Sequence, residues 1–232
     1  MKNNKKILII IGFCLLIIAC ISVSYALLVG FDITGGENKI NTGSITFTYS
    51  EQSNELNIVS NEIISDADGK LLNNYFSFNI ASKASGNIDV GYYIYFTPVA
   101  VEKEQLNMSA IKLYLSSVQN ENDPINTETE VVVPTLLSNL IPFTFDADGN
   151  NARYDASSNN YLIYSTSFNF NNNETTQTHY YRLRLWLDSG YTFSTNVVNE
   201  NNEHTVTIEE KEYKLKVNVL GIDGKPNTIT KA

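Results

Sequence analysis

Cysteine is nearly absent from this chain of 232 residues, and its two cysteines, Cys14 and Cys20, both lie close to the N-terminus. The rest of the chain can therefore form no internal disulfide, so its stability has to come from a hydrophobic core. Basic residues are also scarce, and the formal net charge at pH 7 is -9. This balance excludes nucleic acid as a partner, because a nucleic-acid-binding protein needs a basic face to neutralise phosphate.

Acidic residues are missing from the first 31 positions, where three lysines precede an apolar run over residues 7–23. The basic start, the apolar stretch and a small-residue exit that ends at Ala26 predict a secretory signal peptide over residues 1–26. Two alternatives stay open: residues 7–31 are long enough to remain as an uncleaved membrane anchor, and Cys20 is a candidate for lipidation. All three interpretations place the remaining chain outside the cytoplasm. The chain would contact the membrane only through its N-terminal segment.

Heptads, long amphipathic helices and internal repeats are absent as well, which excludes coiled coils and solenoids. The chain is instead rich in Asn, Thr, Ser and Tyr. Thr and Tyr favour strands, whereas Asn favours the turns between them. Alternation of apolar and polar residues predicts strands over residues 44–49, 56–58, 75–80, 88–99, 110–118, 143–145, 161–168, 178–187 and 213–219.

Three stretches between these strands have a different character. Residues 66–69 (Asp-Ala-Asp-Gly) predict a turn, and the polar residues 120–129 predict an exposed loop. Residues 131–140 are ambiguous between a strand and a short helix, with Pro134 limiting either. Many short strands separated by turn signals predict an all-β fold, a single antiparallel β-sandwich over residues 41–232.

Three blocks of the chain carry a resemblance to a known family. They are the exit SYALLVGFDITGGENKINTGSITF, the segment DADGKLLNNYFSFNIASKASGNIDVGYYIYF, and the closing strands YYRLRLWLD and YKLKVNV. In order and pattern, these blocks resemble the TasA/camelysin family of secreted Gram-positive biofilm-matrix and cell-surface proteins. The stretch 120–160 does not match the family.

The resemblance implies a jelly-roll-like sandwich, exported with the help of a signal peptidase and displayed at the cell surface. It further implies fibres, in which a subunit donates an N-terminal strand to its neighbour, so that the partner is another copy or a related secreted protein. A donated strand adds backbone hydrogen bonds and buried side chains at an exposed sheet edge. Here the donor would be residues 27–40, with Leu27, Leu28, Val29, Phe31 and Ile33 as its apolar anchors; a first strand packed on its own domain is the alternative.

The camelysin members of the family imply a metalloprotease activity, but the positions of the histidines do not fit a metalloprotease site. His179 and His204 lie in no H-E-x-x-H helix, and a zinc enzyme needs three protein ligands. We interpret both as surface histidines and expect no enzymatic activity, no catalytic residue and no cofactor.

A calcium site is a further candidate, because Asp146, Asp148, Asn150 and Asp155 supply the hard oxygen ligands that calcium takes. The spacing does not fit an EF-hand, since the glycine falls at the fourth position and the final glutamate is missing. We therefore favour the simpler interpretation as Asp-Gly turns.

The strand at residues 178–187 predicts two unlike faces. Tyr181, Leu183, Leu185 and Leu187 point one way, and Arg182, Arg184 and Trp186 point the other. The arginine and tryptophan face predicts either a site for a sugar or an acidic polymer, or a face packed against the second sheet or a partner subunit, with the arginine stems covering apolar surface. We favour packing. The sequence as a whole predicts a non-enzymatic, self-associating structural protein, with an adhesin or glycan-binding module as the alternative.

Overall fold

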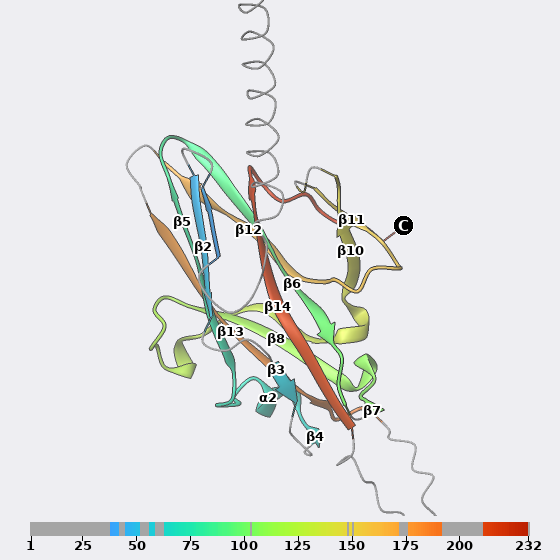
Figure 1. Cartoon of the computed structure of the whole chain (residues 1–232). Coiled ribbons are helices and arrows are strands. Elements are labelled where there is room, and N and C mark those ends of the chain that lie inside the picture. Colours follow the sequence, from blue (N-terminus) through green and yellow to red (C-terminus); the bar gives the residue numbers. More distant parts are fainter. Residues whose placement is uncertain are drawn as a thin grey trace, which may run out of the picture. The chain divides into compact units, whose positions relative to one another are not determined.

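Two β-sheets pack face to face and form a sandwich (Figure 1). In this computed structural model the described residues are 38–41, 45–51, 56–58, 63–102, 104–147, 149, 151–171, 176–191 and 211–231. All of them belong to one compact unit, Gly35–Ala232. The prediction of an all-β, mostly antiparallel sandwich is confirmed, whereas the jelly-roll order of its connections stays a prediction.

The first sheet has β13 at its centre, with strand order β1-β2-β5-β13-β8-β9. β4 runs parallel to the end of β13, and the other pairs are antiparallel. Its strands are β1 Asn38–Asn41, β2 Ile45–Glu51, β4 Ile63–Ile64, β5 Phe76–Ala84, β8 Ile111–Val118, β9 Thr129–Leu136 and β13 Gln177–Asp188.

The second sheet has the order β11-β10-β12-β6-β14-β3, with the two-residue β7 parallel to the start of β14. Its two longest strands, β6 and β14, are paired from Lys214 to Asp223 of β14. Its strands are β3 Leu56–Ile58, β6 Ile88–Val99, β7 Glu104–Gln105, β10 Ile141–Phe145, β11 Ala152–Tyr154, β12 Tyr161–Phe170 and β14 Lys211–Asp223.

The core between the sheets follows the two-residue period of the strands. Tyr181, Leu183, Leu185 and Leu187 of β13 are all buried in it, as predicted, and they meet alternate residues of β6 and β14 from the other sheet. Rings supply much of this core, with Phe78 stacked on Tyr181 at 5.4 Å between ring centres. Buried aromatic side chains contribute large hydrophobic area, which offsets the absence of disulfides in this part of the chain.

A smaller cluster lies on the outer face of the second sheet and is covered by residues 225–231. Tyr93, Phe143 and Ala152 from the sheet pack there with Ile229 from the covering segment. Asn227 fixes this segment, because its side chain exchanges two hydrogen bonds with the backbone of Ala152, at 2.9 and 2.7 Å. An amide in this position takes the place of a further strand beside β11.

Short helical elements occur at four of the connections between strands. Residues 66–69, predicted as a turn, form the one-turn helix α2 Asp66–Gly69, which Ser65 caps by accepting a hydrogen bond from the backbone N–H of Asp68. The ambiguous residues 131–140 contain both predicted types, since β9 is followed by a 3₁₀ turn, η3 Leu137–Asn139. The remaining 3₁₀ turns are η1 Met108–Ala110 and η2 Ile125–Thr127.

In the part of the chain that the structure describes, no helix is long and apolar enough to cross a membrane. The predicted signal peptide, residues 1–26, lies outside the described residues.

α2 packs on the outer face of the first sheet, directly over Trp186 of β13. A Cβ atom added at Gly69 would lie 2.4–2.8 Å from three atoms of the Trp186 side chain, which is fully buried. Lys112 of β8 links the same two elements, since its ammonium group lies 2.8 Å from Asp66 and 2.9 Å from Asp188. Glycine at position 69 is therefore required by the close approach of helix and indole.

We expect Gly69→Ala to lower the free energy of unfolding by about 1–3 kcal/mol, the usual cost of an overpacked buried site. Alanine favours a helix over glycine by about 1 kcal/mol. A variant more stable than the wild type would therefore show that the close contact between position 69 and Trp186 does not exist. Urea denaturation measures the difference. Leu71→Ala is the control, because Leu71 is 64% exposed in the same segment and should change little.

Candidate functional site

The predicted donor segment falls mostly outside the described residues. This applies to all five of its apolar anchors, Leu27, Leu28, Val29, Phe31 and Ile33. Its last residues lie in β1, which pairs antiparallel with β2 of the same chain, with Asn38 opposite Tyr49. The donor segment therefore leads directly into the edge strand of the first sheet.

The sandwich has two sides, each formed by one edge of either sheet. Val131 of β9 and Tyr164 of β12 line the same pocket, so β9 lies on the side of β12, β10 and β11. We call this the β9/β11 side. The opposite edges of the two sheets, β1 and β3, form the β1/β3 side.

The β9/β11 side is poorly suited to accept a further strand. β9 contains Pro134, which has no N–H to donate, and its pairing with β8 shifts register twice. At β11, the Asn227 side chain already bonds both backbone groups of Ala152. Proline, bulges and covered backbone groups are the usual means by which proteins block pairing at a sheet edge.

On the β1/β3 side, a longer stretch of edge has no partner strand among the described residues. β3 covers β14 only opposite Tyr213–Leu215. Among the described residues no strand pairs with this outer edge of β14 over residues 217–222, although β6 pairs with the other edge throughout. Edges of this kind present rows of backbone donors and acceptors to an added strand.

The predicted arginine and tryptophan face is not exposed to a ligand. Arg182, Arg184 and Trp186 are 2%, 0% and 0% exposed, so this face is buried, but neither the second sheet nor a partner subunit covers it. They pack against a cover formed by the same chain: α2 lies over Trp186, and the segment before β9 lies over the arginines. The predicted loop at residues 120–129 is largely exposed, but it ends in the buried side chain of Glu128.

Glu128 holds both arginines at once. One carboxylate oxygen accepts from Arg182 at 2.9 Å and from Arg184 at 2.8 Å, and the other accepts from Arg184 at 2.7 Å. Ser116 of β8 donates a further hydrogen bond to this carboxylate at 2.6 Å. Burial by itself raises the pKa of Glu128, but the hydrogen bonds from Arg184, Ser116 and Arg182 outweigh it and hold the pKa below its ordinary value.

The arginines also bind the backbone of the cover. Arg182 donates to the carbonyls of Glu121 and Asp123, and Arg184 donates to the carbonyl of Leu72 at 2.7 Å. The ring of Tyr75 lies 4.7 and 4.9 Å from the two guanidinium carbons. Together these contacts tie two distant segments to β13. We call Arg182, Arg184, Glu128 and Tyr75 the arginine cluster.

The structure separates two of the predicted calcium ligands. β10 and β11 form a hairpin in which Asp146 bonds Asn151 at the tip, whereas Asp155 lies at the base, next to Pro142. Gly149, with φ +73°, makes the turn at the tip. The other two candidates, Asp148 and Asn150, lie outside the described residues, so a calcium site at the tip stays a prediction.

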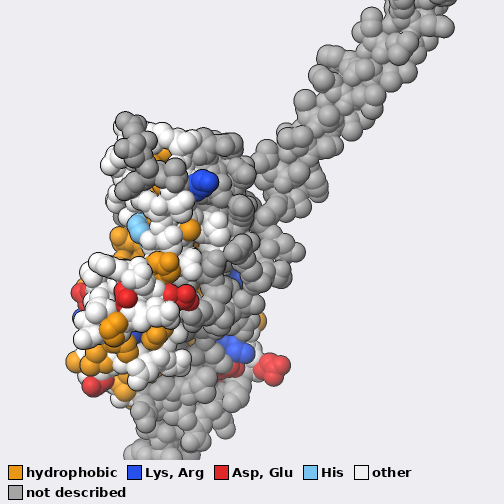
Figure 2. All heavy atoms as spheres, turned by 90° about the vertical axis from the view of Figure 1, so that its left-hand side faces the viewer, with side chains coloured by type: hydrophobic (Ala, Val, Ile, Leu, Met, Phe, Trp, Pro, Cys, Tyr) orange, Lys and Arg blue, Asp and Glu red, His pale blue; other side chains and the backbone are white. Residues whose placement is uncertain are grey.

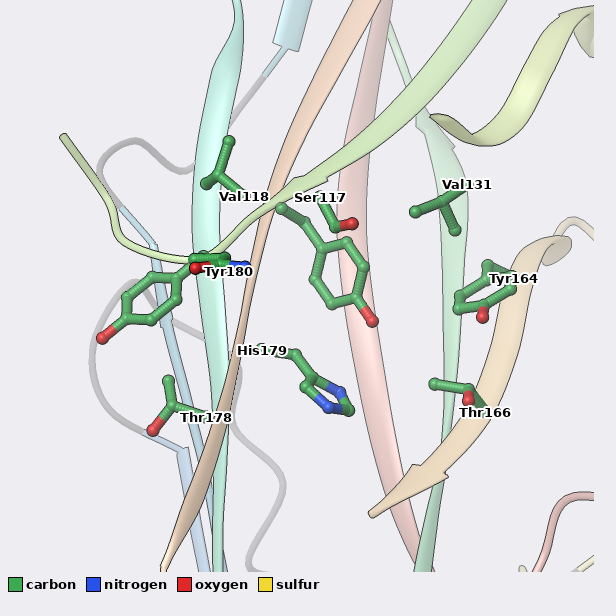
Figure 3. Close-up of a pocket in the computed structure, with 10 residues that line it drawn as sticks. Ser117, Val118, Val131, Tyr164, Thr166, Thr178, His179 and Tyr180 are labelled. Carbon is green, nitrogen blue, oxygen red and sulfur yellow. The ribbon is translucent and has the colours of Figure 1, made fainter. Parts of the chain in front are cut away.

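Within the described ranges, no three side chains of His, Cys, Asp or Glu are grouped so as to hold a metal ion. His204 lies outside those ranges. His179, interpreted from sequence as a surface residue, is half-buried instead and lines a pocket between the sheets (Figure 3). The sequence contains a signal for this burial. His179 lies two residues before Tyr181 on β13, so both side chains point toward the interior of the sandwich.

Comparison of the chain with protein-family models and with curated proteins finds no match. The functional argument therefore rests on the sequence and on the geometry of the described residues.

We expect Glu128→Gln to lower the free energy of unfolding by about 3–5 kcal/mol, because it removes the only counter-charge that the described residues give two buried arginines. Glu130→Gln, two residues along, is the matched control. Glu130 pairs with Lys70 at the surface, where both side chains are more than a third exposed, so the control should change stability little. Urea denaturation at pH 7 measures both.

The pH dependence gives a second readout of the same variant. The folded-state pKa of Glu128 lies below its ordinary value of 4.5, so its stabilisation is present above pH 4.5 and is lost as pH falls through the folded pKa. The gap between wild type and Glu128→Gln should narrow over that range. A gap that is small at pH 7, or one that widens in acid, would contradict a charge-bearing role for Glu128.

Proposed function

We propose that this protein is a secreted structural component of the cell surface or biofilm matrix, which self-associates by strand donation. A subunit would place its N-terminal segment along the outer edge of β14 in a neighbouring copy. This agrees with the resemblance of the sequence to the TasA/camelysin family, whose members are implied to build fibres in the same way.

The observation that carries the proposal is the unequal protection of the sheet edges. Pro134, two register shifts and the Asn227 amide protect the β9/β11 side. In the described part of the chain, no strand pairs with the outer edge of β14 over residues 217–222. A sandwich that protects one side and not the other is suited to pairing with a further strand on the unprotected side.

The donor segment has the pattern that such an edge requires. Leu27, Val29, Phe31 and Ile33 occur at every second position and would share one face of an extended strand. The residues between them, apart from Leu28, are Gly30 and Asp32. A strand with one apolar face can bury that face against the sandwich core while its backbone extends the sheet.

Without cysteines beyond Cys20, fibres of the chain processed after Ala26 cannot be held together by disulfides. Removal of the three N-terminal lysines with the signal peptide takes the formal charge from -9 to -12. Subunits of this charge repel one another, so assembly should be studied near 0.15 M salt, where the Debye length is about 8 Å.

Deleting residues 27–32 from the processed protein should leave a folded monomer that no longer polymerises, because four of the five apolar anchors are lost while β1 and the sandwich stay intact. Circular dichroism and urea denaturation check folding, and electron microscopy with light scattering checks polymerisation. A full-length control carries Thr34→Ala and Glu37→Ala, which change polar positions of the same segment. Normal fibres from the deletion variant, or loss of fibres in the control alone, would contradict the proposal.

A further inference from the structure

A pocket of about 460 Å³ opens between the two sheets on the β9/β11 side. Ser117 of β8, Val131 of β9 and His179 and Tyr181 of β13 line it from the first sheet, and Tyr164 and Thr166 of β12 line it from the second. In Figure 3, the His179 ring lies on the same side of β13 as Thr166 and Tyr164, whereas Thr178 and Tyr180 lie on the other. The volume is within the range of small-molecule sites, about 300–1,000 Å³.

The lining of this pocket contains no charged residue, although the chain as a whole is acidic. Its polar side chains carry hydroxyls, an amide and an imidazole, and its apolar groups are the rings of three tyrosines and the side chains of two valines. In Figure 2, orange and white atoms border the visible part of a histidine ring, and the acidic and basic side chains of the same face lie farther from it. A charged ligand would lose its hydration here without gaining a counter-charge, so the pocket favours a neutral ligand.

His179 is held in place by the residues beneath it. The Tyr92 hydroxyl lies 2.5 Å from Nδ1 of His179 and 2.6 Å from the hydroxyl of Tyr181. The ring of Phe168 stacks on the imidazole with 4.3 Å between ring centres. A side chain fixed in this way loses little freedom when it binds, which is the general advantage of preorganised sites.

The remaining ring nitrogen, Nε2, forms no hydrogen bond with any described residue. Desolvation lowers the pKa of His179, so the imidazole is neutral at pH 7. In a neutral imidazole one nitrogen donates and the other accepts. Because the Tyr92 and Tyr181 hydroxyls can donate in either direction, Nε2 can be either the donor or the acceptor toward the pocket. A ligand hydroxyl, which both donates and accepts, matches either state.

We propose that this pocket binds a neutral polyhydroxylated ligand, a sugar unit of an uncharged polysaccharide. Ser117, Tyr164, Thr166 and Nε2 of His179 would hydrogen bond its hydroxyls, and the tyrosine rings would contact its C–H face. The pocket lies on the side of the sandwich opposite the β14 edge, so sugar binding does not depend on assembly. A matrix protein with both features would bind polysaccharide along its whole fibre.

The test uses the processed protein and the non-assembling deletion variant, with cellobiose, maltose, lactose and N,N′-diacetylchitobiose as neutral probes and digalacturonic acid as the charged probe. Saturation-transfer NMR detects binding, and calorimetric titration measures its Kd. We expect at least one neutral disaccharide to bind both proteins with equal affinity, and the charged probe to bind more weakly. Absence of binding by all four neutral probes, or preference for the charged one, would overturn the proposal.

Thr166→Val and His179→Phe locate the site, because each removes hydrogen-bonding groups but keeps the shape of the side chain. We expect each to weaken binding about three- to tenfold, the effect of losing one hydrogen bond between neutral groups. Thr144→Val is the matched control: Thr144 is equally half-buried on β10 of the same sheet but lies outside the pocket. Binding unchanged in Thr166→Val and His179→Phe, with all variants folded, would show that the sugar binds elsewhere.

Discussion

The carboxylate of Glu128 is the point on which the outer layer of the first sheet depends. It pairs with two arginines that β13 would otherwise leave buried on the outer face of the sheet without a counter-charge from the described residues. Through these arginines, β13 also holds the backbone at Leu72, Glu121 and Asp123. Burying these charged groups costs much free energy of desolvation, so the complete cluster adds little net stability. Removing one partner leaves an unpaired buried charge, and this lowers the free energy of unfolding strongly. Its residues are therefore far less replaceable than the exposed ion pairs nearby.

β13 joins this layer to the rest of the sandwich, since its two faces perform different tasks. One face supplies Tyr181, Leu183, Leu185 and Leu187 to the core and His179 to the pocket. The other supplies the arginine cluster and the indole on which α2 packs. Because the side-chain period of a strand is two, a slip of one residue would exchange these faces and bury the arginines in an apolar core. The register of β13 is thus strongly specified without disulfides.

Alternation along the chain was sufficient to predict the long strands and the faces of β13, because period two is a local property of the sequence. It could not reveal what covers the arginine face, since Glu128 lies 54 residues from Arg182 in a polar stretch that resembles a solvated loop. The same limit applies to β11, whose edge is covered by Asn227 from 75 residues away. For His179 the alternation along β13 indicated an inward side chain, but its partner Tyr92 lies in the other sheet and could not be predicted. Such contacts depend on the packing of distant segments.

The proposed assembly rests on the outer edge of β14, and hydrogen–deuterium exchange of this strand is its most direct measurement. We expect those backbone amides of residues 217–222 that point away from β6 to become protected when the protein assembles, because a donated strand would bond them. The amides of β9 should exchange at the same rate in assembled and unassembled protein, since Pro134 and the register shifts obstruct pairing there. Protection of β9 without any change in β14 would contradict strand donation to this edge.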